Sequence, residues 1–417
     1  GYHDSSTKTT GMLTGTLVKN LGNNTRYETA IYYDSQGRVI QTISDHHLAG
    51  TVRISSKYDF ENKPLETITQ HTTPGTYTIT KGYVYNAAGG LSHINHKINS
   101  GGVVTLATHT YNQLGELTSK AYPVAGAALT SFTYNIRGWL KKINDPQVSN
   151  ATTGVFAQEL FYEAGGGFNQ FGGSIAKAEW KGKDNSKRVY NYYYDMNNRL
   201  ADVLYTVPGS PSEDGRYNIG YVSYDANGNL MSLWRLNERS LGSFGVVDQL
   251  TYTYAVNSNK LLNVADPEPT NFVSKDFKNL GTTNYTYNSN GNLTSNSDKS
   301  ITSITYNHLN LPATITFSGT NKKIDYWYDA QGVKLRQVNT DGATVKTFDY
   351  LGEIVFENNA ISYIMHEEGR ASYENSAFQY EFFVKDHLGN VRQVIRAPVS
   401  VFRVATMEPE NTQEEEK

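Results

Sequence analysis

The sequence predicts an all-β fold made of repeated antiparallel β-hairpins. Three observations lead to this prediction: a short turn phrase that recurs along the chain, strand-like alternation between its copies, and an abundance of tyrosine and glycine. Tyr and Gly account for 31 and 36 of the 417 residues, whereas hydrophobic residues make up only 38%. Many aromatic rings with few large aliphatic side chains suit thin β layers, in which a ring packs and its hydroxyl reaches water or backbone.

The recurring phrase consists of an aromatic residue, Asp or Asn, two variable residues, Gly or Asn, one further residue, and Leu or Val. Its first full copy runs over 33–39, with the sequence YDSQGRV. Asp34 occupies the first position of a type I turn, where its side chain accepts hydrogen bonds from backbone N–H groups ahead of it. Gly37 occupies the fourth position, where a turn followed by a G1 bulge needs a positive φ. We therefore expect each phrase to join two antiparallel strands.

The variation among the copies indicates a constraint on backbone geometry. Asn replaces Gly at positions 62, 198 and 310, and Asn is the non-Gly residue that best tolerates the left-handed region. We expect a set of turn anchors to act through shape alone. These anchors are Tyr33, Asp34, Gly37, Tyr111, Gly115, Tyr134, Gly138, Tyr224, Asp225, Gly228, Tyr287, Gly291, Tyr328, Asp329, Gly332, Asp386 and Gly389.

The spacing of the aromatic anchors gives the length of the repeated unit. Nearly equal intervals separate the successive anchors Tyr33, Tyr58, Tyr85, Tyr111 and Tyr134. Each interval holds two strands, one tight turn and a loop back, and self-similarity of this kind is typical of stacked repeat proteins. The interval from Tyr134 to Tyr194 is more than twice as long as any of these. We place a disguised repeat there, around Phe161, Tyr162 and Trp180.

Between the turns, two kinds of residue alternate along the sequence with the period of a β-strand, for example over 77–85 and 250–254. No stretch predicts a long amphipathic helix. Because the composition does not shift before the last few residues, we expect one continuous β region over 1–392 and an acidic, polar tail or linker over 393–417. Both ends of the sequence are expected to be cuts in a longer chain.

Composition and charge exclude several classes of function. The net charge is −3 with both signs interspersed, so no basic stripe indicates a nucleic-acid partner. No apolar stretch approaches the roughly 18 residues needed for a membrane span. The chain has no cysteine, which excludes disulfides and thiol chemistry. We expect neither a cofactor nor a resident metal.

With its copies laid out, the chain resembles the RHS/YD-repeat family, and most closely the large exported RHS proteins of Bacteroidota. The phrases that carry this resemblance lie at 31–41, 134–140, 306–312, 328–335 and 385–392. The last of these, KDHLGNVR, is similar to the phrase that marks the closing RHS core. The similarity extends from about residue 11 to residue 392.

The resemblance implies a long β-ribbon that spirals into a hollow, barrel-like shell, or β-cocoon. In relatives such shells enclose a C-terminal toxin or other cargo, or stand on the cell surface as adhesive modules. For this chain it implies a non-catalytic shell segment of an exported or cell-surface protein, with type IX secretion as a plausible route. The implied partners are a downstream cargo or effector domain, the export machinery and surface glycans. Many relatives continue to an autoproteolytic site, but no residue here matches one.

Asp386 and His387 form the most enzyme-like pair in the sequence. A His beside a carboxylate is a candidate general base, which makes a hydrolase one alternative function. No Gly-x-Ser-x-Gly elbow or other nucleophile signature accompanies the pair. Because Asp386 occupies the turn position and Gly389 the left-handed position of a repeat phrase, we interpret the pair as part of a structural turn.

Two further patterns are weighed as metal sites. His46, His47, His93 and His96 are candidate ligands, but His residues three apart on a strand point to opposite faces, and no third ligand has a recognisable spacing. We interpret them as ordinary polar strand and loop residues. The phrases at 225–229 and 288–292 superficially resemble calcium loops. Neither has Gly at the sixth place or Glu at the twelfth, so turn chemistry explains them better.

The aromatic strings at 192–194 and 326–328 suggest a second function, an adhesin module that binds glycans or another surface. Exposed aromatic patches mark binding sites, and aromatic rings stack on sugars. The candidate glycan-binding residues are Tyr193 and Trp327. In an alternating strand, however, one aromatic of each pair usually packs between layers.

Overall fold

The computed structural model describes residues 5–7, 9–124, 129–147, 156–163, 170–182, 184–268, 272, 277 and 283–396. Over these ranges the chain forms 31 β-strands and one 3-10 turn, η1 (Pro211–Glu213), without an α-helix. Within each unit the strands pair in antiparallel fashion, and most of them pair with the next strand along the chain. The predicted all-β class with antiparallel hairpins is therefore confirmed. No helix in these ranges is long and apolar enough to cross a membrane.

Contacts divide the chain into two compact units. Unit 1 comprises 1–125, 305–382 and 396–400, and unit 2 comprises 126–304, 383–395 and 401–417. The sequence predicts one continuous region over 1–392 and a tail from residue 393. Strand β31 (Val391–Arg396) continues through the first four residues of that expected tail, so they are not linker. Residues 397–417 lie outside the described residues.

Unit 1 contains two runs of consecutive strands. The first run is β1 (Gly15–Lys19), β2 (Arg26–Tyr33), β3 (Val39–His46), β4 (Gly50–Tyr58), β5 (Pro64–His71), β6 (Tyr77–Tyr85), β7 (Leu91–Ile98), β8 (Val104–Tyr111) and β9 (Leu117–Ala121). The second run is β23 (Pro312–Phe317), β24 (Lys322–Tyr328), β25 (Lys334–Asp341), β26 (Thr344–Leu351), β27 (Ile354–Glu357), β28 (Ala360–His366), β29 (Gly369–Glu374) and β30 (Ala377–Lys385).

Unit 2 contains the middle of the chain. Its strands are β10 (Thr130–Tyr134), β11 (Leu140–Ile143), β12 (Ala157–Phe161), β13 (Lys177–Lys181), β14 (Arg188–Tyr194), β15 (Leu200–Thr206), β16 (Ile219–Tyr224), β17 (Leu230–Ser240), β18 (Ser243–Tyr254), β19 (Leu261–Ala265), β20 (Thr286–Tyr287) and β21 (Leu293–Ser295). The division between the units falls inside β22 (Ile301–Tyr306), β30 and β31.

The hairpins share one irregularity that follows from the turn phrase. In the pairing of β2 with β3, Tyr32 lies opposite Gln41 but Tyr33 lies opposite Val39, so the register shifts between the two tyrosines. The same shift occurs immediately before the aromatic anchor in β4–β5, β6–β7, β8–β9, β14–β15 and β24–β25. One extra residue on the return side is the signature of a β-bulge, which is what the turn phrase predicts.

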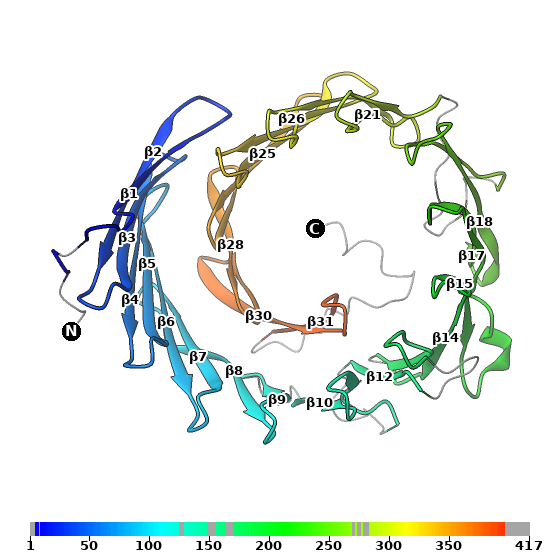
Figure 1. Cartoon of the computed structure of the whole chain (residues 1–417), viewed down its shortest axis with the longest axis horizontal. Helices are drawn as coiled ribbons and strands as arrows, with labels where there is room; N and C mark the ends of the chain where they lie inside the picture. The colour runs from blue at the N-terminus through cyan, green and yellow to red at the C-terminus, as the bar shows by residue number, and fades with distance from the viewer. Residues whose placement is uncertain are drawn as a thin grey trace. The chain divides into compact units, whose positions relative to one another are not determined.

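In unit 1 the first run of strands forms one layer and the second run forms another, and the two pack face to face. Figure 1 shows β4–β8 in blue to cyan beside β28 and β30 in orange. Their shared core contains Ile79 and Ile98 from the first layer and Ile354, Phe356 and Ile364 from the second. Unit 1 is thus closed by the packing of strands that are far apart in the sequence.

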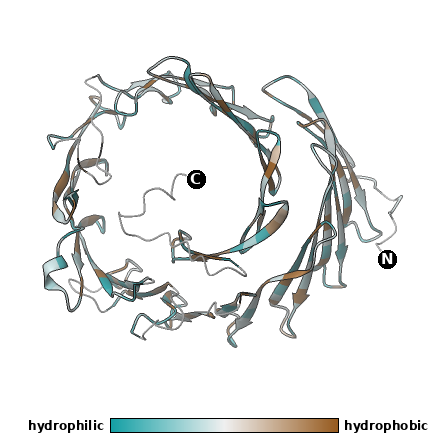
Figure 2. Cartoon of the chain, turned by 180° about the vertical axis from the view of Figure 1, so that it is seen from behind, coloured by the Kyte–Doolittle hydropathy of each residue, from teal (hydrophilic) through white to brown (hydrophobic). Residues whose placement is uncertain are grey.

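Aromatic rings form part of the packing of unit 2. Trp180 and Tyr190 lie 4.9 Å apart between ring centroids, and Tyr190 lies 5.5 Å from Tyr205. A second cluster, around Leu250, Val264 and Tyr285, closes the hairpins of β17–β21. Figure 2 shows hydrophobic and hydrophilic residues alternating along the strands, as expected of strands with one packed face.

Candidate functional site

The turn at Asp34 illustrates how the phrase fixes the backbone. The Asp34 Oδ1 atom accepts hydrogen bonds from the backbone N–H groups of Gln36 (2.9 Å) and Arg38 (3.0 Å). The Gly37 N–H donates to the Asp34 carbonyl at 3.1 Å, and Gly37 has φ +79°. Burial alone would raise the pKa of Asp34, but the backbone N–H and the guanidinium of Arg38 lower it. The carboxylate is therefore held charged as part of the turn.

The same backbone geometry recurs at the other expected turn positions. The glycines of these turns have φ values between +75° and +86°: Gly115, Gly138, Gly228, Gly291, Gly332 and Gly389. Asn62, Asn198 and Asn310 stand in the left-handed region at +67°, +59° and +58°. Asp225 and Asp329 accept backbone hydrogen bonds in the same pattern as Asp34, from the second and fourth residues ahead. These positions are consistent with a role in shape.

The tyrosine anchors have a function that the sequence analysis missed. In successive repeats the anchor hydroxyl donates to a backbone carbonyl near the start of the return strand of the preceding repeat. Tyr58 bonds to Val39 (3.0 Å), and Tyr111 bonds to Leu91 (2.8 Å). The other donors of this tyrosine ladder are Tyr33, Tyr85, Tyr162, Tyr194, Tyr224, Tyr254 and Tyr287, with distances of 2.5–2.9 Å. These repeats are thereby hydrogen-bonded to the segment that precedes them.

The ladder also locates the disguised repeat. The Tyr162 hydroxyl donates to the Leu140 carbonyl at 2.9 Å, and the Tyr194 hydroxyl donates to the Ile175 carbonyl at 2.8 Å. Tyr162 is thus the anchor expected near Phe161; Glu163 replaces the Asp or Asn of the phrase, whereas Gly166 stands at its glycine position in the sequence. Its separation from Tyr134, which is close to one repeat length, was the signal in the sequence.

A second set of polar residues lies between the two layers of unit 1, which we call the polar seam. It comprises His47, Lys81, His96, His109 and Lys120 from the first layer, with Asp349, Glu353, His366, Glu367, Glu368 and Tyr380 from the second. The hydrogen bonds and ion pairs that cross the seam join residues between 248 and 302 positions apart. Sequence patterns gave no sign of it.

Buried carboxylates of the polar seam are matched with cations. His47 Nε2 and Asp349 Oδ1 lie 3.0 Å apart, and the Arg336 guanidinium donates to the same carboxylate at 2.6 Å. Burial by itself would raise the pKa of Asp349, but the hydrogen bonds from His47 and Arg336 lower it. Asp349 is 1% exposed, so an unpaired charge there would be costly.

Two further clusters repeat this arrangement along the seam. Lys81, which is 6% exposed, contacts Glu353 and donates to Glu367 at 2.7 Å. Although burial disfavours its ammonium form, these carboxylates raise the pKa of Lys81. Glu368 accepts hydrogen bonds from Lys120 at 2.7 and 2.8 Å and lies 3.2 Å from His109.

The structure places Asp386 and His387 in a turn of unit 2. The Asp386 carboxylate accepts from the backbone N–H groups of Leu388 and Asn390 at 2.9 Å and from the Arg392 guanidinium at 2.8 Å. His387 Nδ1 lies 3.0 Å from Gln158 Oε1. The hydrogen bonds of the Asp386 carboxylate are therefore made with its own turn and with Arg392. The hydrogen bonds of His387 are made with the side-chain amide of Gln158.

The candidate metal ligands are not brought together as a site. Over the described residues, no group of three or more His, Asp or Glu side chains is arranged to hold a metal ion. His96 is fully buried against Tyr380, whereas we expected an ordinary polar strand residue. In the loops that resemble calcium sites, Asp225 and Asn288 use their Oδ1 atoms to accept backbone N–H groups of their own turns.

The two candidate glycan-binding aromatics are only partly exposed. A Cβ atom on Gly22 would stand 2.8 Å from the Trp327 ring, so the backbone at Gly22 covers that ring closely. The Arg336 guanidinium lies 4.8 Å from the Trp327 ring centroid. Tyr193 is half-buried in β14, opposite Asp202.

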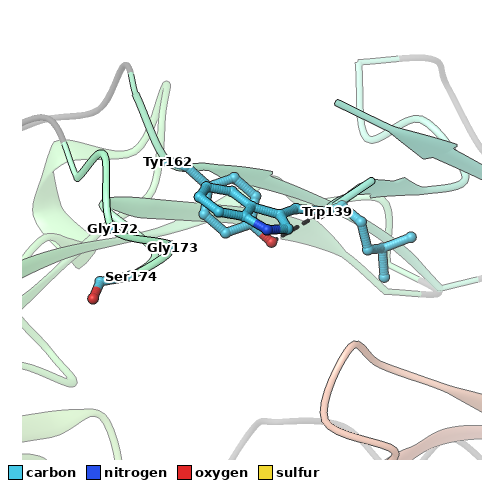
Figure 3. A pocket seen from close by; sticks show the side chains of 6 residues that line it. Trp139, Tyr162, Gly172, Gly173 and Ser174 are labelled. Carbon is cyan, nitrogen blue, oxygen red and sulfur yellow. Dashed lines mark hydrogen bonds between the residues drawn. The ribbon is translucent and has the colours of Figure 1, made fainter. Parts of the chain in front are cut away.

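A hollow of about 440 Å³ lies beside a different tryptophan, in unit 2. It is lined by Trp139, Leu140, Tyr162, Gly172, Gly173 and Ser174, and Figure 3 shows the Trp139 and Tyr162 rings overlapping at its edge. The two ring centroids are 5.1 Å apart, and the Arg137 guanidinium lies 5.0 Å from the Trp139 ring. Trp139 occupies the phrase position that Arg38 and Arg199 hold elsewhere, and those residues also stand over the next anchor tyrosine. The stacking is therefore part of the repeat.

No protein-family profile and no curated protein matches the chain. Among solved structures it is similar to TcdB2-TccC3 without the hypervariable C-terminal region, with 12% identity, a TM-score of 0.32, and coverage of 92% of this chain and 26% of that one. It is also similar to the Photorhabdus luminescens Tc holotoxin pore with the mutation TccC3-D651A, with 12% identity, a TM-score of 0.26, and coverage of 88% of this chain and 26% of that one. A porin-like protein from Bacteroides uniformis matches with 9% identity, a TM-score of 0.19, and coverage of 68% of this chain and 87% of that one. The chain spans about a quarter of the Tc chains. At these TM-scores the matches assign no family.

Proposed function

We propose that the chain is a non-catalytic structural segment of an exported or cell-surface repeat protein, whose stacked hairpins enclose or display a C-terminal cargo such as a toxin. The tyrosine ladder is the observation that carries this proposal. Within the part of the chain that the structure describes, it bonds nine anchor tyrosines to backbone carbonyls of the segments that precede them, which suits a continuous wall, and it does not involve the variable turn residues. The mechanism is steric, since a wall excludes proteases and shields the producing cell from the cargo.

The ladder and the polar seam together favour a mechanical role over a chemical one. The conspicuous acidic groups, Asp34, Asp225 and Asp386, are committed to turns, and Asp349 is committed to an ion pair between layers. A wall that is closed on itself would also hide its strand edges, which otherwise invite aggregation. The enclosing shell and the cargo are the parts of the proposal that the resemblance to RHS proteins suggests.

Limited proteolysis of the full-length protein that contains this chain tests the proposal, with intact mass as the readout. Enclosure predicts that sequence downstream of Lys417 survives while this region is intact, and that it is digested in the Asp349→Ala variant, whose seam is weakened. Immediate loss of the downstream sequence from the wild-type protein, with this region persisting, would show an open scaffold or adhesin instead. Asp195→Ala, in a turn of unit 2, is the matched control and should leave the protection unchanged.

A further inference from the structure

Two histidines face each other across the layers of unit 1. His96 lies on β7 and His366 ends β28, and their ring centroids are 5.8 Å apart. Tyr380 of β30 packs against both rings, at 5.6 and 5.5 Å, and its hydroxyl lies 2.7 Å from His96 Nδ1. His96 is 0% exposed and His366 is 6% exposed. This three-ring contact therefore joins the two layers in a place closed to solvent.

Both rings have a buried nitrogen without a hydrogen bond. His366 Nδ1 accepts from the backbone N–H of Glu368 at 3.3 Å, which places its proton on Nε2. The Nε2 atoms of His96 and His366 are buried and have no hydrogen-bond partner. A neutral imidazole tolerates such a place at moderate cost, whereas a charged one loses its hydration without compensation.

Burial lowers the pKa of His366 and outweighs the carboxylates of Glu367 and Glu368, which raise it but are each already paired with a lysine. Lys81 of β6 is the cation that faces both histidines, and its two carboxylate partners, Glu353 and Glu367, are already matched with it. Glu368, the other carboxylate near His366, is matched with His109 of β8 and Lys120 of β9. Protonation of both rings would thus place two further positive charges beside Lys81 and beside each other.

We infer that His96 and His366 form an acid-sensitive latch, which holds the two layers of unit 1 together at neutral pH and releases them when both rings are protonated. The inference concerns how unit 1 is held closed and does not depend on whether the chain encloses a cargo. Layer separation would expose both rings to water, where a charged imidazole is hydrated. The latch is therefore driven by the difference in solvation between the closed and the open arrangement.

The direction of the pH dependence follows from burial. Burial lowers the pKa of His96 to about 3 and the pKa of His366 to about 4, from an ordinary value of 6.5. Below pH 6.5 the open arrangement binds more protons than the closed one, so closure weakens as the pH falls from 6.5 toward 4. Each histidine contributes up to tenfold per pH unit, so the pair contributes up to about a thousandfold between pH 6.5 and 5.

His46 and His71 provide a competing explanation that the experiment must separate. Both are buried, and burial lowers the pKa of each to about 4. They lie at the ends of β3 and β5, within the first layer, and face each other and His47. Their protonation would disturb that layer without acting directly on the contact between His96 and His366.

Amide hydrogen exchange followed by mass spectrometry tests the latch, at pH 7.5 and 5.0 with exchange times corrected for the intrinsic rates. In the wild-type chain, peptides from β6–β8 and from β28–β30 should both lose protection at pH 5.0, by at least tenfold, while peptides from β14–β15 of unit 2 keep theirs. The double variant H96N/H366N retains a polar atom at each δ position but cannot be protonated, and it should stay protected at pH 5.0. The exposed-turn variant H308N should respond as the wild type does.

Two outcomes would overturn the latch: unchanged wild-type protection at pH 5.0, or an acid response that persists in H96N/H366N. The second would assign the response to His46 and His71 or to the other pairs of the seam. If the double variant does not fold, exchange at the imidazole Cε1 hydrogen of the wild type measures each titration directly. His96 and His366 should then titrate at least one pH unit below the ordinary histidine value of 6.5, and midpoints at that ordinary value would contradict the inference.

Discussion

The repeat turns and the polar seam are both built from charged and aromatic residues, but they differ in how far apart in the sequence their contacting residues lie. A turn such as that at Asp34 is complete by Arg38, and its neighbour in the ladder lies only one repeat away along the chain. The polar seam instead joins residues such as His47 and Asp349, which are 302 positions apart. The turns therefore determine the hairpin structure of each repeat, whereas the seam determines which strands pack together when they are far apart in the sequence.

This difference predicts how each region fails. Loss of one turn or one ladder bond should weaken a single hairpin, because the neighbouring repeats keep their own bonds. Loss of a seam contact should weaken the contact between two layers, because a buried charge is left unpaired. The predictions below are arranged from the largest expected effect to the smallest.

The largest effect is expected for Asp349→Ala. The substitution leaves the Arg336 guanidinium and His47 without their carboxylate in a place where Asp349 is 1% exposed. We expect the free energy of unfolding of unit 1 to fall by about 3 kcal/mol. Urea denaturation followed by tyrosine and tryptophan fluorescence measures it. The exposed ion pair of Lys346 with Glu357 provides the control, and an equally large loss in Glu357→Ala would contradict the special role of the seam.

An intermediate effect is expected for Gly228→Val. Gly228 has φ +86°, and a Cβ atom there would meet nothing within 4 Å, so the cost comes from the backbone alone. We expect a loss of roughly 1–3 kcal/mol in the free energy of unfolding, from the strain of a β-branched residue at positive φ. Gly228→Asn should cost clearly less, since Asn fills this turn position at 62, 198 and 310. Equal losses in the two variants would refute the turn assignment.

The smallest effect is expected for Tyr111→Phe. It removes one ladder bond, the 2.8 Å hydrogen bond to the Leu91 carbonyl, and keeps the ring. We expect a loss of about 1 kcal/mol, measured by urea denaturation. Tyr373→Phe is the matched control, because Tyr373 is 39% exposed and outside the ladder. If the ladder bond does not stabilise the fold, both variants will show the same free energy of unfolding.

The fold could be predicted from the sequence where the determinants are local. Asp34 and Gly37 reveal a turn because only a few residue types satisfy that backbone geometry, and the same holds for the copies at Asp225 and Asp329. Tyr162 was located by its separation from Tyr134, because Glu163 replaces the Asp or Asn that marks the other copies. The hydroxyl bonds of the ladder were not predicted, although the regular distance from each anchor to the preceding return strand contained the signal.

The polar seam could not be predicted, and the reason is physical. His96 reads as a polar strand residue because a single sequence does not show that Tyr380 and His366, which come more than half of the chain later, will cover it. The same holds for Lys81, which looks like a solvent-exposed lysine until Glu353 and Glu367 are placed beside it. For the glycan hypothesis, the sequence does not show that the backbone at Gly22 lies against the Trp327 ring.

The most direct test compares the long-range contacts of the seam with the short-range contacts of the ladder in one experiment. Amide hydrogen exchange is measured across the whole chain at pH 7.5 for the wild type, Asp349→Ala and Tyr111→Phe. The account predicts that Asp349→Ala lowers protection in both layers of unit 1 together, from β3–β5 to β25–β28, whereas Tyr111→Phe lowers it only in the hairpins around β7–β9. A loss confined to the immediate neighbours of residue 349 would contradict it, because the seam would then not be what joins the layers.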